Sequence, residues 1–163
     1  MAKSFSFDVV CRLDLNEVRN AVNLAQKEIA TRYDFKNSIS KVTLDDEGIT
    51  LVSDNEGKLR AVVELLQEKL VRRSVPLKGL VYGKVEAALG GTVRQHVTLA
   101  NGIPEDKARE MNRDLRHRFK KVSVAIQGDT LRLSSPSKDE LQAAMAALRE
   151  DDRGLPLQFT NYR

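Results

Sequence analysis

Apolar residues recur at helical spacing in four segments of the chain. In the first segment Leu15, Val18 and Val22 follow one another at intervals of three and four, and Ala25 and Ile29 continue the series. Because a helix turns once in about 3.6 residues, this spacing places all five side chains on one face. The same spacing predicts three further amphipathic helices, with apolar residues at Leu59, Val62, Val63, Leu66 and Leu70; at Ala108, Met111, Leu115 and Phe119; and at Leu141, Met145 and Leu148.

Segments of alternating or β-branched residues between these helices predict strands. They span residues 4–12, 40–44, 49–53, 80–89, 93–99, 122–127, 130–134 and 157–162. The turn sequences at 45–48 and 127–129 predict two tight hairpins. The order of elements is therefore βαββαβ, written twice, which predicts an α+β fold with antiparallel sheets.

Residue identities support an internal duplication. Six residues recur eighty positions later, namely Val42, Gly48, Thr50, Leu51, Pro76 and Leu77, which match Val122, Gly128, Thr130, Leu131, Pro156 and Leu157. We expect one unit in residues 1–90 and a second in residues 91–163, with Gly90 and Gly91 as a flexible junction. The helix before the hairpin in the first repeat matches the corresponding helix of the second repeat at an offset of ninety. The first repeat therefore carries about ten extra residues between helix and strand, at 31–40.

Length and composition fit a folded protein of two small packed units. The chain has 163 residues, of which 41% are hydrophobic and 31% are charged, and this balance excludes disordered and collagen-like classes. No stretch approaches the ~20 apolar residues of a membrane span and no signal pattern is present, so we expect a cytoplasmic protein without membrane contact. A single cysteine, Cys11, excludes an intrachain disulfide and favours a buried structural thiol.

Patterns typical of catalysis are missing from the sequence. The two histidines, His96 and His117, form no metal-binding pair, and the chain contains no P-loop, no GxSxG and no SxxK element. The acidic clusters at 45–47 and 151–152 lie at predicted turns rather than as a paired acid and base. We therefore expect no enzyme, no metal and no cofactor.

The third predicted helix carries a row of basic residues. Lys and Arg outnumber Asp and Glu by 27 to 23, a balance that mildly favours an acidic partner such as a nucleotide or RNA. At about 100° per residue four of the cations fall on one stripe, which we call the basic stripe and predict to bind nucleic acid. Its members are Arg109, Arg113, Arg116 and Lys120. The alternative is a solvated helix face that pairs with the acidic residues Glu105, Asp106, Glu110 and Asp114.

The insertion at 31–40 mixes rings, cations and a carboxylate. Such a mixture can stack a base and hold a phosphate, and long loops in small domains often carry function. The predicted nucleotide-binding residues are Arg32, Asp34, Phe35 and Lys36. Alternatively, Tyr33 and Phe35 plug a sheet edge or the seam between the units. Phe159 and Tyr162, on the last predicted strand, have the same ambiguity.

Several motifs together resemble one protein family. They are SFDVV at 6–10, the helix with Asn20, Ala21 and Glu28, RYDFKNS at 32–38, AIQGD at 125–129 and PLQFTNYR at 156–163. In these segments the chain resembles the YajQ family of bacterial nucleotide-binding proteins over nearly its whole length. The resemblance implies two tandem ferredoxin-like units whose N-terminal strands are exchanged. It also implies binding of purine nucleotides and tRNA without catalysis, and some members are cyclic di-GMP receptors that act with a transcription factor.

The sequence therefore predicts a non-catalytic protein that binds ATP, GTP, cyclic di-GMP or an RNA such as tRNA. A second interpretation remains open. In it the chain is a protein–protein interaction module that acts with a transcription factor and has no nucleotide ligand of its own.

Overall fold

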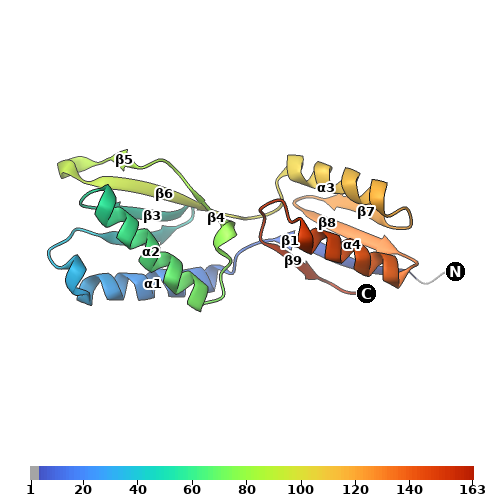
Figure 1. Ribbon diagram of the computed structural model, residues 1–163, viewed down its shortest axis with the longest axis horizontal. Coiled ribbons are helices and arrows are strands. Elements are labelled where there is room, and N and C mark those ends of the chain that lie inside the picture. Colours follow the sequence, from blue (N-terminus) through green and yellow to red (C-terminus); the bar gives the residue numbers. More distant parts are fainter. Residues whose placement is uncertain (1–3) are drawn as a thin grey trace. The chain divides into compact units, whose positions relative to one another are not determined.

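The computed structural model describes residues 4–163, which form two compact units (Figure 1). Residues 13–100 make up one of them, which we call the continuous unit. Residues 4–12 and 101–163 together make up the other, which we call the split unit. Each unit combines two α-helices with one antiparallel sheet, which confirms the predicted α+β fold of two tandem ferredoxin-like units.

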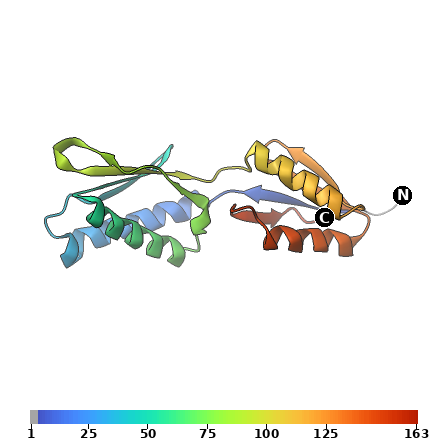
Figure 2. The same cartoon turned by 45° about the horizontal axis from the view of Figure 1, so that its top comes forward.

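The continuous unit has the strand order β2-β3-β6-β4, with β5 also paired to β6. Its strands are β2 (Lys41–Asp45), β3 (Gly48–Ser53), β4 (Leu80–Tyr82), β5 (Glu86–Ala87) and β6 (Val93–Leu99). Its helices are α1 (Leu15–Thr31) and α2 (Glu56–Arg72), and short 3-10 turns lie at Tyr33–Phe35, Leu77–Gly79 and Leu89–Gly91. Figure 2 shows α1 and α2 together on one side of these strands.

The split unit has the strand order β7-β8-β1-β9. Its strands are β1 (Phe5–Cys11), β7 (Ser123–Gln127), β8 (Thr130–Ser135) and β9 (Leu157–Thr160). Its helices are α3 (Glu105–Arg118), which packs along β7, and α4 (Lys138–Glu150), which packs along β8 and β1.

The first strand of each repeat lies in the unit that the other repeat builds. β1, at the start of the chain, pairs with β8 and β9, whereas β6, which begins the second repeat, pairs with β3 and β4. Both are central strands, so neither sheet is complete without the strand that it receives. The exchange of N-terminal strands expected from the family resemblance is confirmed.

The glycine pair has a different role from the predicted one. Because β6 belongs to the continuous unit, Gly90 and Gly91 form the turn between β5 and β6 inside that unit, both with positive φ, and not a junction. The chain passes between the units at 12–13 and at 100–101. The predicted strand at 80–89 is also divided, into β4 and β5.

From the hairpin to the second helix, the repeats correspond in space at an offset of 82 rather than eighty. Asp45 and Gly48 flank the turn between β2 and β3, and the equivalent pair at the turn between β7 and β8 is Gln127 and Thr130. The residues that cap α2 and α4, Asn55 and Ser137, are also 82 apart. A shift of two residues leaves every strand side chain on the same face, so alternation cannot distinguish the two offsets.

Side-chain acceptors start three of the four helices. Asp14, Asn55 and Ser137 each accept a hydrogen bond from a backbone N–H two or three residues ahead, at 3.0, 2.8 and 3.2 Å. These bonds satisfy amides of the first turn that have no partner within the helix. α3 ends at Arg118, earlier than predicted, because Phe119 takes an extended conformation and its carbonyl accepts from Val122 in a turn toward β7.

Alternate residues of β1 point to opposite faces of the sheet in the split unit. Phe7, Val9 and Cys11 are at most 1% exposed and form part of the core, whereas Asp8 between them points to the other face. Burial raises the pKa of the Cys11 thiol, and the interpretation of this residue as a buried structural thiol is confirmed.

The exchange predicts unequal behaviour of two fragments. Residues 13–100 contain every strand and helix of the continuous unit and should fold cooperatively alone. Residues 93–163 lack β1, the strand between β8 and β9, and should not fold. Circular dichroism with thermal melting, and the dispersion of amide NMR signals, distinguish the two outcomes.

A fusion provides the control for this experiment. Residues 4–12, joined by a short Gly/Ser linker to residues 101–163, restore the whole split unit and should fold. A cooperative fold of residues 93–163 without β1 would contradict the role assigned to the exchanged strand.

Candidate functional site

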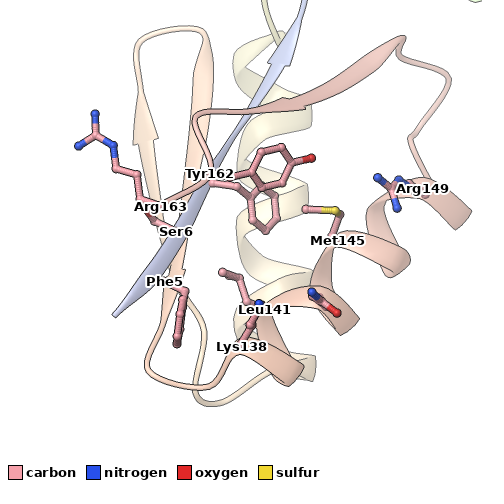
Figure 3. A pocket seen from close by; sticks show the side chains of 10 residues that line it. Phe5, Ser6, Lys138, Leu141, Met145, Arg149, Tyr162 and Arg163 are labelled. Atoms are coloured by element: carbon pink, nitrogen blue, oxygen red, sulfur yellow. The ribbon is translucent and has the colours of Figure 1, made fainter. Parts of the chain in front are cut away.

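A hollow of about 700 Å³ in the split unit is lined by α4, β1 and the segment after β9 (Figure 3). We call it the aromatic hollow. Its lining residues are Phe5, Ser6, Phe7, Lys138, Leu141, Gln142, Met145, Arg149, Tyr162 and Arg163. The volume lies within the range of roughly 300–1,000 Å³ that is usual for small-molecule sites.

Aromatic rings form one wall of the aromatic hollow. The buried Phe7 ring meets Phe159 edge to face, with centroids 5.7 Å apart, and meets Tyr162 at 6.3 Å with an angle of 34° between the ring planes. Figure 3 shows the side chains of Tyr162, Leu141 and Met145 converging from the C-terminal segment and from α4. Tyr162 is 62% exposed, so part of its ring is open to a planar ligand.

Cations lie on α4 at the rim of the aromatic hollow. Lys138 begins the helix and Arg149 lies in its last turn, roughly 16 Å further along the axis. Neither makes an ion pair with another residue of the described chain, although the Arg149 guanidinium lies 5.1 Å from the centroid of the Phe159 ring. The side chain of Arg163 points away from the converging residues (Figure 3). The site thus joins an apolar wall to two cations that are available to an anion.

Asp8 lies on the opposite face of the sheet from Phe7. Its carboxylate accepts hydrogen bonds from Arg132 Nε at 2.8 Å, from Arg132 Nη2 at 3.2 Å and from the Asn161 side-chain amide at 2.8 Å. The bonds from Arg132 and then Asn161 hold the pKa of Asp8 below its usual value, although burial opposes them. The carboxylate is therefore ionised and fully engaged, and it takes no part inside the hollow.

The continuous unit has a smaller hollow, of about 440 Å³, in the equivalent place. On α2 it is lined by Glu56, Leu59, Arg60, Val63 and Gln67, which are equivalent at an offset of 82 to the five α4 residues of the aromatic hollow. Duplication therefore produced the same hollow twice. The chemistry differs, because Glu56 and Gln67 occupy the places of the cations Lys138 and Arg149.

Most of the nucleotide-binding residues predicted in the insertion at 31–40 contact one another or the core of the continuous unit. Phe35 is 3% exposed and belongs to the core of the continuous unit. Arg32 donates two hydrogen bonds to Asp34, at 3.0 and 2.7 Å, and this pairing holds the pKa of Asp34 below its usual value. The Arg32 guanidinium and the Lys58 ammonium lie 5.3 and 5.5 Å from the centroid of the Phe35 ring. Of the four predicted residues, Lys36 is the one whose exposed side chain has no hydrogen bond or ion pair with the described residues.

The predicted basic stripe is shorter than expected. Lys120 lies beyond the end of α3, in a turn, and therefore leaves the helical row. Arg109 pairs with Glu105, one turn earlier. Arg113 and Arg116 remain exposed on α3, and neither has an ion pair within residues 4–163. The stripe thus reduces to two available cations on consecutive turns of the helix.

The structure shows no other concentration of metal-binding or catalytic groups in the chain that it describes. No group of three His, Cys, Asp or Glu residues within 4–163 is placed to hold a metal ion. His96 is held by a contact of 2.9 Å between its Nε2 and the backbone carbonyl of Glu47. None of the helices in this range has the length and apolar character needed to cross a membrane.

Sequence reasoning noticed Tyr162 but missed its partners on α4. Lys138 and Arg149 stand eleven positions apart in a helix that reads as ordinary and amphipathic. A usable signal existed in the repeat, since comparison at the correct offset shows two cations where the first repeat has Glu56 and Gln67.

Comparison with known proteins assigns the chain to a family. The family model described as "Nucleotide-binding protein YajQ-like" matches residues 5–163. A nucleotide-binding protein of Desulfitobacterium hafniense is 53% identical over 163 residues, all of both chains. One from Koribacter versatilis is 50% identical over 158 residues, 97% of this chain and 96% of its own, and one from Bacillus cereus is 49% identical over the full length of both. The chain therefore belongs to the YajQ-like family.

Proposed function

We propose that this protein binds a nucleotide in the aromatic hollow and does not turn it over. One observation carries the proposal: an exposed tyrosine ring and two unpaired cations share the lining of a single hollow of about 700 Å³. A base can stack on Tyr162, as bases do on aromatic side chains. Lys138 and Arg149 can then bind phosphate oxygens through charge-assisted hydrogen bonds. The family match supports the same ligand class.

The chemistry of the hollow favours a purine nucleotide with more than one phosphate charge. Two cations at opposite ends of α4 suit a ligand that is both long and anionic. ATP, GTP and cyclic di-GMP meet both conditions, because each joins a purine to several negative oxygens. The equivalent hollow in the continuous unit, with Glu56 in the place of Lys138, should not bind them. We therefore propose one nucleotide site in each chain.

Removal of either rim cation should weaken nucleotide binding. Lys138→Ala and Arg149→Ala should each lower the affinity about tenfold, since a hydrogen bond to a charged group contributes about 1.5 kcal/mol. Isothermal titration calorimetry with ATP, GTP and cyclic di-GMP in parallel measures the change. Arg60→Ala, which removes an exposed cation from the equivalent hollow on α2, is the matched control and should bind as the wild type does.

Two results would contradict this site. Unchanged affinity in both α4 variants, together with a loss in Lys36→Ala, would move the nucleotide to the insertion at 31–40. A wild-type protein that binds none of the three nucleotides would instead favour the interaction module acting with a transcription factor.

The lining of the aromatic hollow also argues against turnover. It contains no Asp, Glu, His or Cys that could act as a general base or nucleophile. Phosphate release from ATP or GTP should therefore equal that of buffer, with or without Mg²⁺, in a malachite green assay. Hydrolysis that persists through purification and disappears on a single substitution would show that a catalytic site exists.

A second ligand is favoured by the two available cations on α3. We propose that Arg113 and Arg116 contact the phosphates of an RNA such as tRNA, because both are exposed and unpaired on consecutive helical turns. Each phosphate contact releases counterions and so adds to the salt dependence of binding.

Replacement of both arginines by alanine should weaken RNA binding equally for all sequences. The slope of log affinity against log salt should fall by about 1 to 2, and nucleotide affinity should be unchanged. Filter binding of tRNA at several salt concentrations measures both quantities. Arg60→Ala with Arg72→Ala removes the same charge from α2 and is the control. An unchanged slope in the α3 variant would show that these arginines lie on a solvated helix face and do not contact RNA.

A further inference from the structure

The C-terminal segment leaves the register of β9 at one point. Asp8 lies opposite Thr160 in the ladder between β1 and β9. Ser6 and Arg163 then exchange both backbone hydrogen bonds, at 3.2 and 3.0 Å. Between these two pairs β1 contributes one residue, Phe7, whereas the C-terminal segment contributes two. The segment therefore contains a β-bulge, which we call the terminal bulge and which consists of Asn161 and Tyr162.

The terminal bulge decides which side chain enters the aromatic hollow. In an unbroken ladder residue 161 would lie opposite Phe7, and residue 162 would point to the far face beside Asp8. The extra residue reverses this order. The Asn161 amide instead donates to Asp8 on the far face, and the Tyr162 ring lies against Phe7 on the face of the hollow. Without the bulge, the hollow would have an asparagine in place of its exposed ring.

Asn161 suits the terminal bulge in two ways. Its φ of 55° lies in the left-handed region, which asparagine tolerates better than most residues with a side chain. Its side chain also finds a fixed acceptor, because Asp8 has only 10% of its side chain exposed and is held from β8 by both hydrogen bonds of Arg132. A buried carboxylate in a fixed position selects the conformation that brings a donor to it.

The continuous unit contains an extra residue at the equivalent point, but Lys84, in the place of Asn161, does not have a positive φ. Gly83 N–H bonds the carbonyl of His96, and Glu86 lies opposite Arg94, so two residues again face one. At the positions equivalent to Asp8 and Arg132 the continuous unit has His96 and Thr50. The extra residue thus occurs in both units, whereas the left-handed conformation and the Asp8–Arg132 ion pair occur in the unit whose hollow carries the exposed ring and the cations.

We propose that Asp8, Arg132 and Asn161 are positioning residues for the aromatic hollow, which hold the terminal bulge so that the Tyr162 ring faces the bound nucleotide. This inference rests on the proposed nucleotide site. None of the three residues touches the nucleotide, because the Asp8 and Asn161 side chains meet on the opposite face of the sheet. They act on binding only through the position of the Tyr162 ring.

Substitution of Asn161 tests the two properties that suit it to the terminal bulge, namely its left-handed backbone conformation and its hydrogen-bond donor. Asn161→Val disfavours positive φ and removes the donor, so the Tyr162 ring should leave Phe7 and nucleotide affinity should fall about tenfold, the effect of removing one base-stacking interaction. Asn161→Gly retains the left-handed conformation but also removes the donor, so its affinity should fall less, by about threefold. Calorimetry with ATP, GTP and cyclic di-GMP gives the affinity. Nuclear Overhauser effects between the Tyr162 and Phe7 rings give the ring position without ligand.

A double-mutant cycle tests the anchor itself. Asp8→Ala and Asn161→Gly both remove the same hydrogen bond, so their combination should bind no more weakly than the weaker of the two single variants. This cycle, with each variant checked by thermal melting, decides the matter even where Asn161→Val fails to fold. Lys84→Val, at the equivalent bulge of the continuous unit, is the control and should leave nucleotide affinity unchanged.

Three results would overturn the inference. The first is wild-type affinity in Asn161→Val although its Tyr162 ring has moved away from Phe7. The second is a Tyr162 ring that still lies against Phe7 in that variant, and the third is additive losses of affinity in the cycle. Absence of nucleotide binding by the wild type would overturn the proposed function instead. The ring position measured without ligand would still decide whether the terminal bulge positions Tyr162.

Discussion

Both sheets depend on a central strand that another part of the chain supplies. β1 lies between β8 and β9, and without it these two strands would have no neighbour in common. One face of β1 provides the core residues Phe7, Val9 and Cys11, and the opposite face provides Asp8. The same short strand therefore closes the hydrophobic core, forms part of the wall of the aromatic hollow and anchors the segment that completes it. Folding of the split unit and assembly of its site are consequently one event.

The two repeats share the backbone of the hollow but not its chemistry. The two hollows share a second helix, a central strand and a bulge at equivalent positions. They differ in most of their side chains: for example, Phe7 corresponds to Gln95, Tyr162 to Val85, and Lys138 to Glu56. An apolar and cationic site for a nucleotide thus needs no change of fold. Such a site needs only aromatic and cationic side chains at the lining positions that both repeats share.

Periodicity predicted the helices and strands well, since amphipathic stripes of three to five apolar residues leave little freedom. It could not predict the exchange of strands, which followed from the family resemblance, because a strand of the same pattern fits either sheet. The offset of eighty came from six residue identities, and alternation could not correct it, since a shift by two keeps the same side chains on the same face. The sequence pattern also could not predict which of Tyr33 and Phe35 is buried. They are two positions apart in one segment, yet Phe35 is buried in the core and Tyr33 is 87% exposed.

The site was harder to predict because its residues meet only through the fold. The charge run and the aromatic insertion are visible in the sequence itself. For this reason the binding residues were predicted on α3 and at 31–40. The aromatic hollow, where we propose the nucleotide site, joins β1, α4 and the C-terminal segment, and each of these segments has an ordinary sequence pattern. Its exposed ring also depends on a break in the strand pattern. Alternation from Thr160 onward assigns Tyr162 to the side of Asp8, and only the extra residue at Asn161 turns it to the side of Phe7. The Asn161 amide, which donates to Asp8 on the far face, and the Arg132 side chain, which holds Asp8 in place, are the contacts that we propose to keep the tyrosine facing the hollow.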